Sequence, residues 1–428
     1  MIRVLMVGYN GANNTGAEAL LQSDIEDVRE VLGPEAHITV PTLNEANLRR
    51  YLAEGPALRI APMPTLFFAS IRRMVRESDL VLLVEGSTYM DGWGSPLLWF
   101  FLWASHCAAE MGKPCLAYAV DAGNLKPGNA RLVQRVASRA GLIVTRNRAA
   151  AGRLRAVGVT APVACTADNA FTFQPREADL GWLAREWPRA AGGVVGLAPV
   201  NFHLLPAVMR PWGRRDRCYK WPYYFSSSPE RRAASEALAR AYAATADRIV
   251  EATGKAVALI CMEQLDEPIA NRVRSCMRHP DDARVFSARE QDASRMTTLL
   301  RSLDLLITSR YHAAVLSLAA AVPQIAVGHD TRLDTIYRDL GLREEWFLTP
   351  DRLGELGQRV ERLLAAPDLQ RERLRQGYAE HLARARQNRR LLAGFASEHL
   401  PGAEPGGAEP VGWFGGRSSA EGGVSWVA

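Results

Sequence analysis

The sequence predicts an α/β fold made of two Rossmann-like domains that face a common cleft. Its 428 residues are too many for one ordinary core and suit two domains. Short apolar runs alternate with longer segments of helical spacing, which is typical of parallel sheets covered on both faces. The alternation stops in the turn-rich segment 174–193 and then starts again. These three observations together predict a doubled α/β architecture.

The elements of the first domain follow from five apolar runs with the length of buried strands. They occupy residues 2–7, 37–40, 80–84, 115–119 and 142–145, and segments of helical spacing such as 20–32 and 130–140 lie between them. In parallel sheets of this kind, ligands bind outside the carboxyl ends of the strands. We therefore expect the active site where these strand ends open onto the cleft.

The second domain is predicted from a second series of apolar runs, at 194–198, 257–261, 283–286, 303–308 and 324–327. We assign residues 1–180 to the N-terminal domain and 190–375 to the C-terminal domain. Helical spacing continues to residue 400, and 376–400 is assigned to a C-terminal helical segment. From 401 to 428 the chain is rich in Gly, Pro, Ser and Glu, which predicts a disordered tail.

Composition narrows the classes of function. The hydrophobic fraction of 48% and the charged fraction of 23% are typical of globular proteins. A net charge of +6 is mild, and neither zinc-finger spacing nor an RNA-binding motif accompanies it, so we expect no nucleic-acid partner. The six cysteines include no Cys-x-x-Cys pair, which favours reduced thiols in a cytoplasmic protein, and no metal cluster is expected.

The cellular location is predicted from both the start of the chain and its apolar stretches. The sequence begins directly with its first predicted strand, so no signal peptide is expected. The longest apolar stretch, 96–109, is interrupted by Ser105 and His106 and is too short to span a bilayer. It predicts a buried helix, and we expect the protein to be cytoplasmic.

A glycine-rich turn, GYNGANNTGAEALL at residues 8–21, joins the first strand to the first helix. Ala17 and Glu18 stand where a P-loop has Lys and Ser or Thr, and the glycine spacing does not match the dinucleotide fingerprint. Asn13, Asn14 and Gly16 permit a tight or left-handed backbone. Glu18 compensates the helix dipole in the first helical turn, or accepts hydrogen bonds from sugar hydroxyls or acts as a base.

A second informative stretch is DLLITSRYHAAVLSLAAAVPQIAVGHD, residues 304–330. Arg310 and His312 lie at the turn between a predicted strand and a helix rich in small residues. An arginine that binds an anion and an imidazole that moves protons can share one pocket there. The next strand ends in Gly-His-Asp at 328–330, which places Asp330 at the same edge of the sheet.

The segment 209–232 departs from the alternating pattern, because arginines and a lysine are interleaved with tryptophans, tyrosines and a phenylalanine. It follows the first strand of the second domain, where a loop would open onto the cleft. Aromatic faces stack on sugar rings, and arginines pair with phosphates. A solvated irregular insert is the alternative interpretation.

In order and spacing, these segments resemble the polysaccharide pyruvyl transferase family over residues 1 to about 345. The opening turn is similar to the family's glycine-asparagine turn, with Gly-Ala-Glu-Ala at 16–19 in place of the usual Gly-Asp-Glu-Ala. LVEGSTYMD (83–91), GKPCLAYAVDAGNL (112–125), VTRNRAAAGRLRAVGV (144–159) and CTADNAF (165–171) resemble its further motifs. SRYHAAVLSLAAAVPQIAVGHDTRL (309–333) matches its Arg-x-His-Ala stretch and the downstream Asp.

The resemblance implies a GT-B-like fold and the transfer of pyruvate from phosphoenolpyruvate to a sugar of a cell-surface polysaccharide, with release of phosphate. Forming the ketal requires cations for the donor's charges and an acid/base with a pKa near neutrality, roles that suit Arg310 and His312. Candidate substrate-binding residues are Asn14, Gly16, Glu18, Asp91, Asp168 and Asp330. The chemistry requires neither a cofactor nor a metal.

Two departures from the family pattern bear on the substrate pockets. Pro-Val at 199–200 stands where family members commonly carry an arginine after the first strand of the second domain. The arginine-rich segment 209–232 offers a substitute for that donor-binding cation. Glu-Gly-Ser at 85–87 replaces a run of glycines, which indicates an altered acceptor or donor pocket.

Three functions are compatible with these residues. The first is a pyruvyl transferase acting on a sugar or a lipid-linked oligosaccharide. The second is a GT-B glycosyltransferase that uses a nucleotide sugar, and the third is a non-catalytic relative that binds glycans, against which Arg310 and His312 argue. Because polysaccharide precursors are often carried on membrane lipids, we also expect a loose contact of segment 209–232 with the inner membrane face.

Overall fold

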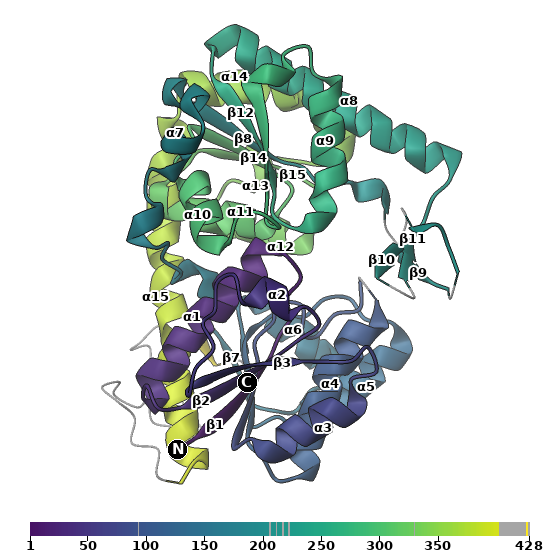
Figure 1. The fold of residues 1–428 in the computed structure, drawn as a ribbon, viewed down its shortest axis with the longest axis vertical. Coiled ribbons are helices and arrows are strands. Elements are labelled where there is room, and N and C mark those ends of the chain that lie inside the picture. Colours follow the sequence, from purple (N-terminus) through teal and green to yellow (C-terminus); the bar gives the residue numbers. More distant parts are fainter. Residues whose placement is uncertain are drawn as a thin grey trace. The chain divides into compact units, whose positions relative to one another are not determined.

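The chain forms two compact units in the computed structural model (Figure 1). The first comprises Met1–Ala12, Ala17–Phe173 and Glu380–Ala428, and the second comprises Asn13–Gly16 and Gln174–Ala379. The structure describes residues 1–92, 94–204, 207–210, 212–215, 218–220, 223–328, 330–401 and 425–426. Each unit contains a predominantly parallel sheet with helices, so the predicted fold class of two Rossmann-like α/β domains is confirmed.

The first unit contains an eight-stranded sheet in the order β17-β7-β6-β5-β4-β1-β2-β3. All neighbours pair in parallel except β17 and β7. The strands are β1 (Arg3–Val7), β2 (His37–Thr42), β3 (Leu58–Pro62), β4 (Leu80–Leu83), β5 (Cys115–Val120), β6 (Leu142–Thr145), β7 (Val163–Cys165) and β17 (Ser425–Trp426). The five predicted strands are confirmed; β3, which contains Arg and Pro, and the three-residue β7 carried too weak an apolar signal.

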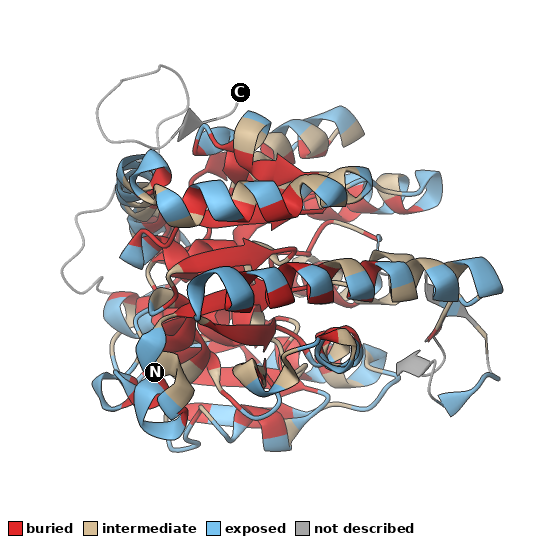
Figure 2. Ribbon diagram, turned by 90° about the horizontal axis from the view of Figure 1, so that it is seen from above, coloured by how far each residue is buried: buried red, intermediate tan, exposed pale blue. Residues whose placement is uncertain are grey.

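Helices of the first unit are α1 (Thr15–Leu32), α2 (Glu45–Leu48), α3 (Phe68–Glu77), α4 (Ser95–Glu110), α5 (Pro127–Ala137), α6 (Arg148–Val157) and the later part of α15 (Asp368–His399). Alternate residues of β1 enter two different cores. Leu5 and Val7 pack with residues of α3, α4, α5 and α6, whereas Val4 and Met6 pack with residues of α1 and α15. The sheet is therefore covered on both faces, and its strands are buried (Figure 2).

The second unit contains a six-stranded parallel sheet in the order β13-β12-β8-β14-β15-β16. The strands are β8 (Val194–Ala198), β12 (Ala256–Cys261), β13 (Ala283–Ser287), β14 (Leu305–Thr308), β15 (Gln324–Val327) and β16 (Phe347–Leu348). Counted along the chain this is the doubly wound order 3-2-1-4-5-6, in which the direction of winding reverses between the first and fourth strands. The reversal lies between β8 and β14, which marks the expected ligand-binding edge.

Helices of the second unit are α7 (Trp182–Glu186), α8 (Pro229–Thr253), α9 (Glu267–Cys276), α10 (Ala293–Arg301), α11 (Tyr311–Ser317), α12 (Thr331–Asp339), α13 (Arg343–Trp346), α14 (Leu356–Ala365) and the first part of α15. Short 3₁₀ turns include η4 (Phe202–Leu204), which follows β8, and η6 (Gln264–Asp266), which leads into α9. Among the described helices of the chain, none is long and apolar enough to cross a membrane.

Part of the segment 209–232 folds into a small antiparallel sheet with the order β10-β11-β9. Its strands are β9 (Ala207–Met209), β10 (Cys218–Lys220) and β11 (Tyr223–Phe225), and α8 begins directly after it with Ser228 as its N-cap. Arg217 and Trp221 of this segment lie outside the described residues.

The division of the chain contains one feature that the apolar pattern did not indicate. Residues 13–16, which form the end of the turn after β1 and the start of α1, belong to the second unit. The helical segment predicted at 376–400 is continuous with the preceding residues as α15. Of the tail predicted to be disordered, 402–424 and 427–428 lie outside the described residues, and 425–426 form β17.

Candidate active site

The carboxyl end of β14 lies at the reversal point of the second sheet. There, the Ser309 amide donates to the carbonyl oxygen of Ala198 at the end of β8, at 2.9 Å. The side-chain hydroxyl of Ser309 lies 3.2 Å from the Tyr242 hydroxyl of α8. Arg310 follows at once as the N-cap residue of α11. The predicted strand-to-helix turn therefore forms at the edge where this class of sheet binds ligands.

Arg310 is held by two carboxylates that follow β12, the strand on the other side of β8 from β14. Its Nε donates to Asp266 Oδ2 at 2.9 Å, its Nη1 to Glu263 Oε2 at 3.1 Å, and its Nη2 to Asp266 Oδ1. Only 14% of the Arg310 side chain is exposed, against 8% for Glu263 and 2% for Asp266. Three hydrogen bonds thus fix the plane of the guanidinium.

The electrostatics of this cluster follow from its burial. Burial lowers the pKa of Arg310, but the charges of Asp266 and Glu263 outweigh that effect and raise the pKa above its usual value. Burial raises the pKa of Glu263 and of Asp266, and Arg310 opposes both rises. The arginine therefore stays cationic, and its charge is balanced by groups of its own unit.

The segment Asn13–Gly16 pairs with the residues that follow β12. The Thr15 amide donates to Met262 O at 2.9 Å, and the Gln264 amide donates to Asn13 O at 3.1 Å. Asn14 and Glu263 form an antiparallel bridge. The predicted tight backbone is present, because Asn13 has a φ of +48°. These bonds fix the turn against the loop that holds Arg310.

His312 lies against this segment. A Cβ atom placed on Gly16 would overlap the His312 imidazole, and Nδ1 is the nearest ring atom. Only glycine leaves room for the ring at this position. Tyr311 packs edge-on against the same ring, with centroids 5.0 Å apart. The structure thus brings Asn14, Gly16 and His312, which the sequence separates by almost 300 residues, into one site with Arg310.

Asp330 lies at the next strand end of the same sheet. Its carboxylate accepts from the Arg332 amide at 2.8 Å and from Arg332 Nε at 3.0 Å, which caps α12. Its charge contributes to raising the pKa of Arg310, after the larger effects of burial and of the two paired carboxylates. His329, which precedes it, lies outside the described residues.

Glu18, in the first unit, is almost fully buried, at 2% exposure. Its Oε1 accepts from Arg50 Nη2 at 3.1 Å and from Asn47 Nδ2 at 3.4 Å. The carboxylate is therefore bound to side chains of the neighbouring α2 region, in addition to lying in the first turn of α1.

Asp91 is also buried, and its Oδ2 holds the start of α5. It accepts from the Lys126 amide at 3.0 Å and from Asn129 Nδ2 at 2.6 Å. Lys126 is the N-cap residue of that helix. The contacts of Asp91 thus order a helix terminus of the first unit.

Asp168 belongs to a buried charge cluster at the carboxyl ends of three adjacent strands. Arg146, which follows β6, donates to Asp121 after β5 at 2.9 Å and to Asp168 after β7 at 2.6 Å. The other oxygen of Asp168 accepts from the Ala170 amide at 2.8 Å. Both carboxylate oxygens of Asp168 are therefore bound within the first unit.

Gly86 explains part of the departure at 85–87. A Cβ atom at Gly86 would overlap the guanidinium of Arg146. The one glycine retained in Glu-Gly-Ser therefore stands where the buried arginine approaches the backbone. Glu85 accepts from the Tyr9 amide at 3.3 Å and from the Ser87 amide at 3.2 Å, so it secures the turn after β4.

The sequence interpretation missed Glu263 and Asp266, which hold Arg310, and it did not assign a role to Arg146. A signal for the two carboxylates was present, because CMEQLDEP places acidic residues directly after the predicted strand 257–261. Strand ends of one parallel sheet share an edge. Among the described residues, no group of three or more His, Cys, Asp or Glu side chains could hold a metal ion.

Comparison with known proteins supports the arrangement. The model of a family described as polysaccharide pyruvyl transferase matches residues 14–331. No curated protein sequence matches the chain. The match begins at Asn14, includes Arg310 and His312, and ends directly after Asp330.

Solved structures share the fold over nearly the whole chain. MnaA of S. aureus with UDP has a TM-score of 0.62 at 11% identity, covering 97% of this chain and 100% of that one. The UDP-GlcNAc 2-epimerase of Neisseria meningitidis bound to UDP-GlcNAc has a TM-score of 0.55 at 9% identity, covering 93% and 100%. A glycosyltransferase from Rickettsia africae has 0.54 at 11%, covering 94% and 99%. These likenesses confirm the predicted GT-B-like fold.

Proposed function

Because the chain belongs to the polysaccharide pyruvyl transferase family, we propose that it moves pyruvate from phosphoenolpyruvate onto two hydroxyl groups of a sugar. The products are a cyclic ketal and inorganic phosphate. Family membership makes the protein a transferase that modifies polysaccharides. The observation that carries the finer proposal is the meeting of Gly16 and His312 beside the fixed guanidinium of Arg310.

The proposed reaction delivers one proton to carbon and removes one proton from each of the two hydroxyl groups. His312 protonates the methylene carbon of phosphoenolpyruvate, and the second carbon becomes cationic. A sugar hydroxyl attacks this carbon and returns its proton to His312. A neighbouring hydroxyl then displaces phosphate, which takes up the second hydroxyl proton, and the ring closes. An imidazole suits this cycle because its ordinary pKa lies near neutrality.

Arg310 is proposed to orient the donor. Three of its N–H groups are bound to Asp266 and Glu263, so the remaining N–H groups of Nη1 and Nη2 point in fixed directions. A guanidinium held in this way donates to a carboxylate or phosphate oxygen without losing side-chain entropy on binding. Asn14 and Asp330, on the same sheet edge, are proposed to bind substrate with it.

In the first unit, Glu18, Asp91 and Asp168 are proposed to support acceptor binding. Their carboxylates are bound within the protein, so their proposed role is to position neighbouring backbone and side chains. We propose that the acceptor is a sugar or a lipid-linked oligosaccharide of a cell-surface polysaccharide. The protein would then work in the cytoplasm, in loose contact with the inner membrane face.

Donor binding is the direct test. Phosphoenolpyruvate should raise the melting temperature of the full-length protein by mass action on the folded state, whereas UDP-glucose and GDP-mannose should not. With a suitable glycan acceptor, the protein should release inorganic phosphate in proportion to the ketal formed. Stabilisation by a nucleotide sugar alone would favour a glycosyltransferase, and stabilisation by none of these ligands would favour a non-catalytic glycan-binding protein.

A further inference from the structure

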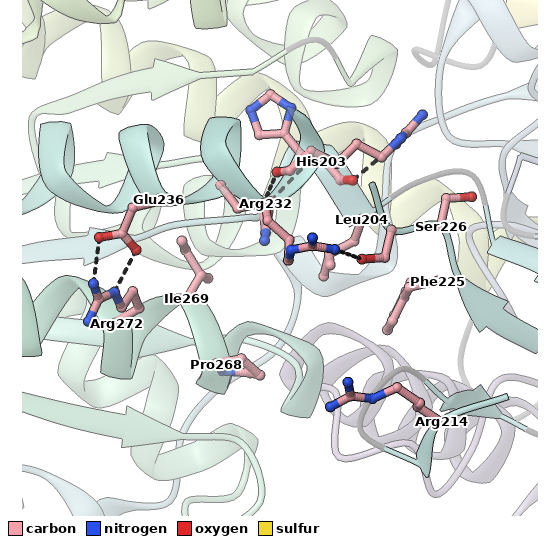
Figure 3. Close-up of a pocket in the computed structure, with 14 residues that line it drawn as sticks. His203, Leu204, Arg214, Phe225, Ser226, Arg232, Glu236, Pro268, Ile269 and Arg272 are labelled. Carbon is pink, nitrogen blue, oxygen red and sulfur yellow. Dashed lines mark hydrogen bonds and ion pairs between the residues drawn. The ribbon is translucent and has the colours of Figure 1, made fainter. Parts of the chain in front are cut away.

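The second unit contains a pocket with a volume of about 660 Å³. It lies between η4, the small β9–β11 sheet, the first turns of α8 and the start of α9 (Figure 3). Neither Arg310 nor His312 is among the described residues that line it. Its volume falls in the range of small-molecule sites. It is therefore a candidate site separate from the one that contains His312.

The charge of this pocket is strongly positive. Four arginines line it, Arg214, Arg231, Arg232 and Arg272, and Glu236 is the one carboxylate among its described lining residues. Glu236 is bound bidentately by Arg272, as Figure 3 shows, and this pairing lowers the pKa of Glu236 to about 2. The pair therefore stays ionised and neutral in sum, and Arg214, Arg231 and Arg232 are the other arginines of the described lining.

The positions of two of these arginines are partly fixed by the protein itself. Arg231 Nη1 donates to the carbonyl oxygen of His203 at 3.0 Å, which ties the first turn of α8 to η4. Arg232 Nη1 donates to Ser227 Oγ at 3.2 Å. Both residues lie in the first turn of a 25-residue helix, whose N-terminus adds positive potential. The arrangement favours an anion that carries more than one negative charge.

The rest of the lining is suited to a sugar. The Asn201 amide and the hydroxyl groups of Ser226, Ser227 and Ser235 offer donors and acceptors, and the ring of Phe225 offers a face for stacking. Ser235 is already oriented, because its hydroxyl donates to Asn201 Oδ1 at 3.0 Å. A three-carbon donor such as phosphoenolpyruvate has no ring or hydroxyl groups to use these contacts.

We propose that this pocket binds a sugar through a phosphate ester or diphosphate attached to it, and that it holds the acceptor of the reaction. The acceptor role rests on the proposed function, whereas binding of a sugar phosphate does not. Asn201 and His203 follow β8, and Pro268 follows Asp266, which holds Arg310. The anionic end of an acceptor in this pocket would therefore lie along the same sheet edge as the donor.

Calorimetric titration of the full-length protein at constant ionic strength tests the ligand class. The probes are glucose 1-phosphate, glucose, inorganic phosphate and glycerol 3-phosphate. Glucose 1-phosphate should bind at least tenfold more tightly than the other three, because it alone supplies both ring and charge. Equal binding of inorganic phosphate would reduce the pocket to a simple anion site, and equal binding of glycerol 3-phosphate would indicate a lipid headgroup; either result overturns the proposal.

Variants locate the binding and separate the two proposals. Arg232→Gln and Arg214→Gln should each weaken glucose 1-phosphate binding about tenfold to a hundredfold, the usual effect of losing a charge-assisted hydrogen bond. Arg274→Gln is the matched control, since Arg274 is an exposed arginine of α9 outside the lining, and it should change nothing. Unchanged binding in both test variants would disprove the assignment. Because no phosphoenolpyruvate is present, this outcome is independent of whether the protein transfers pyruvate.

Discussion

The His312 imidazole packs directly against the backbone of Gly16, in the space that a Cβ atom at residue 16 would occupy. The two residues belong to the same unit, although they are 296 positions apart along the chain. Hydrogen bonds from Asn13 and Thr15 to the loop after β12 hold Gly16 in place. The orientation of the candidate acid/base is therefore set by the N-terminal turn.

Replacing Gly16 by alanine should test this relationship. The added methyl group would overlap the His312 ring, and a displacement of about 1 Å in a catalytic group can lower turnover by about a hundredfold. Gly152→Ala in α6 is the control, because a Cβ there meets no atom within 4 Å. Steady-state phosphate release should fall for Gly16→Ala and stay unchanged for Gly152→Ala. Full activity of Gly16→Ala would show that the ring position is unimportant.

His312→Ala should lower turnover by a factor of about a hundred or more, as expected for removal of a general acid/base. The phosphoenolpyruvate-induced shift in melting temperature should remain, because the donor's charges are bound by other groups. Single-turnover phosphate release compared with the thermal shift distinguishes these effects. Unaltered turnover would remove His312 from the mechanism.

Arg310→Ala should destabilise the second unit as well as weaken donor binding. It leaves Glu263 and Asp266 buried without their cation, and such a loss costs about 3–5 kcal/mol. Arg310→Lys should restore only part of the stability and of the donor binding, because an ammonium group cannot make the same set of hydrogen bonds as the guanidinium. Urea unfolding with and without phosphoenolpyruvate measures them. Wild-type stability in Arg310→Ala would contradict the role of this cluster.

The loss of stability caused by Arg310→Ala should also depend on pH. Burial already raises the pKa of Glu263 and Asp266, and replacing Arg310 removes the main effect that opposes that rise. The folded pKa values then exceed the unfolded ones, so the penalty is greatest above the folded values. It should disappear as the pH falls below about 4, where both states bind the protons. Urea unfolding of Arg310→Ala at several pH values between 4 and 8 measures this dependence.

Asp24→Asn should stabilise the first unit at neutral pH. Burial, and next the charge of Asp27, raise the pKa of Asp24 well above its usual value. The folded state therefore binds this proton more tightly, and the stability it contributes is lost as pH rises from about 4 through the folded pKa. In the structure, Asn169 Nδ2 donates to Asp24 Oδ1 at 2.7 Å. The side-chain oxygen of asparagine can accept this bond without carrying a charge. The free energy of unfolding should differ less between pH 5 and pH 8 in the variant than in the wild type. An equal or larger difference would contradict the raised pKa of Asp24.

Membrane contact should depend on the segment 209–232. Trp212 is 73% exposed and Val208 48% exposed, and the Arg210 guanidinium lies 5.1 Å from the centre of the Tyr224 ring. Exposed cations near an anionic surface contribute about 1 kcal/mol each, which salt screens. Flotation with phosphatidylglycerol vesicles should therefore recover the protein at low salt only, and Trp212→Ala should reduce recovery. Absence of flotation at low salt would contradict the membrane contact and leave the enzyme proposal intact.

The local sequence pattern predicted most of the strands and the strand-to-helix turn that carries Arg310 and His312. Buried parallel strands are nearly continuous apolar runs, so ten of them could be located. The Arg310–His312 turn followed from its place between such a strand and a helix. These features depend on neighbouring residues only, which is why a single sequence contains them.

What the pattern missed depends on partners distant in the chain. The pairing of Arg310 with Glu263 and Asp266 was not predicted, because β12 lies one strand beyond β8 in a doubly wound sheet. The partners of Asp168, which are Arg146 and a backbone amide, were not predicted either. Pairings of this kind are set by the order of strands in the sheet, which apolar periodicity does not encode.

The membership of Asn13–Gly16 in the second unit affects how the chain can fold during its synthesis. During synthesis these residues emerge first, but their partners at 262–264 follow some 250 positions later. The first unit likewise lacks part of its core until Leu391 and Phe395 of α15 have been added. At roughly 5–20 residues per second, the nascent N-terminal half waits tens of seconds for these segments. Neither unit can therefore finish folding before its part of α15 has been synthesised.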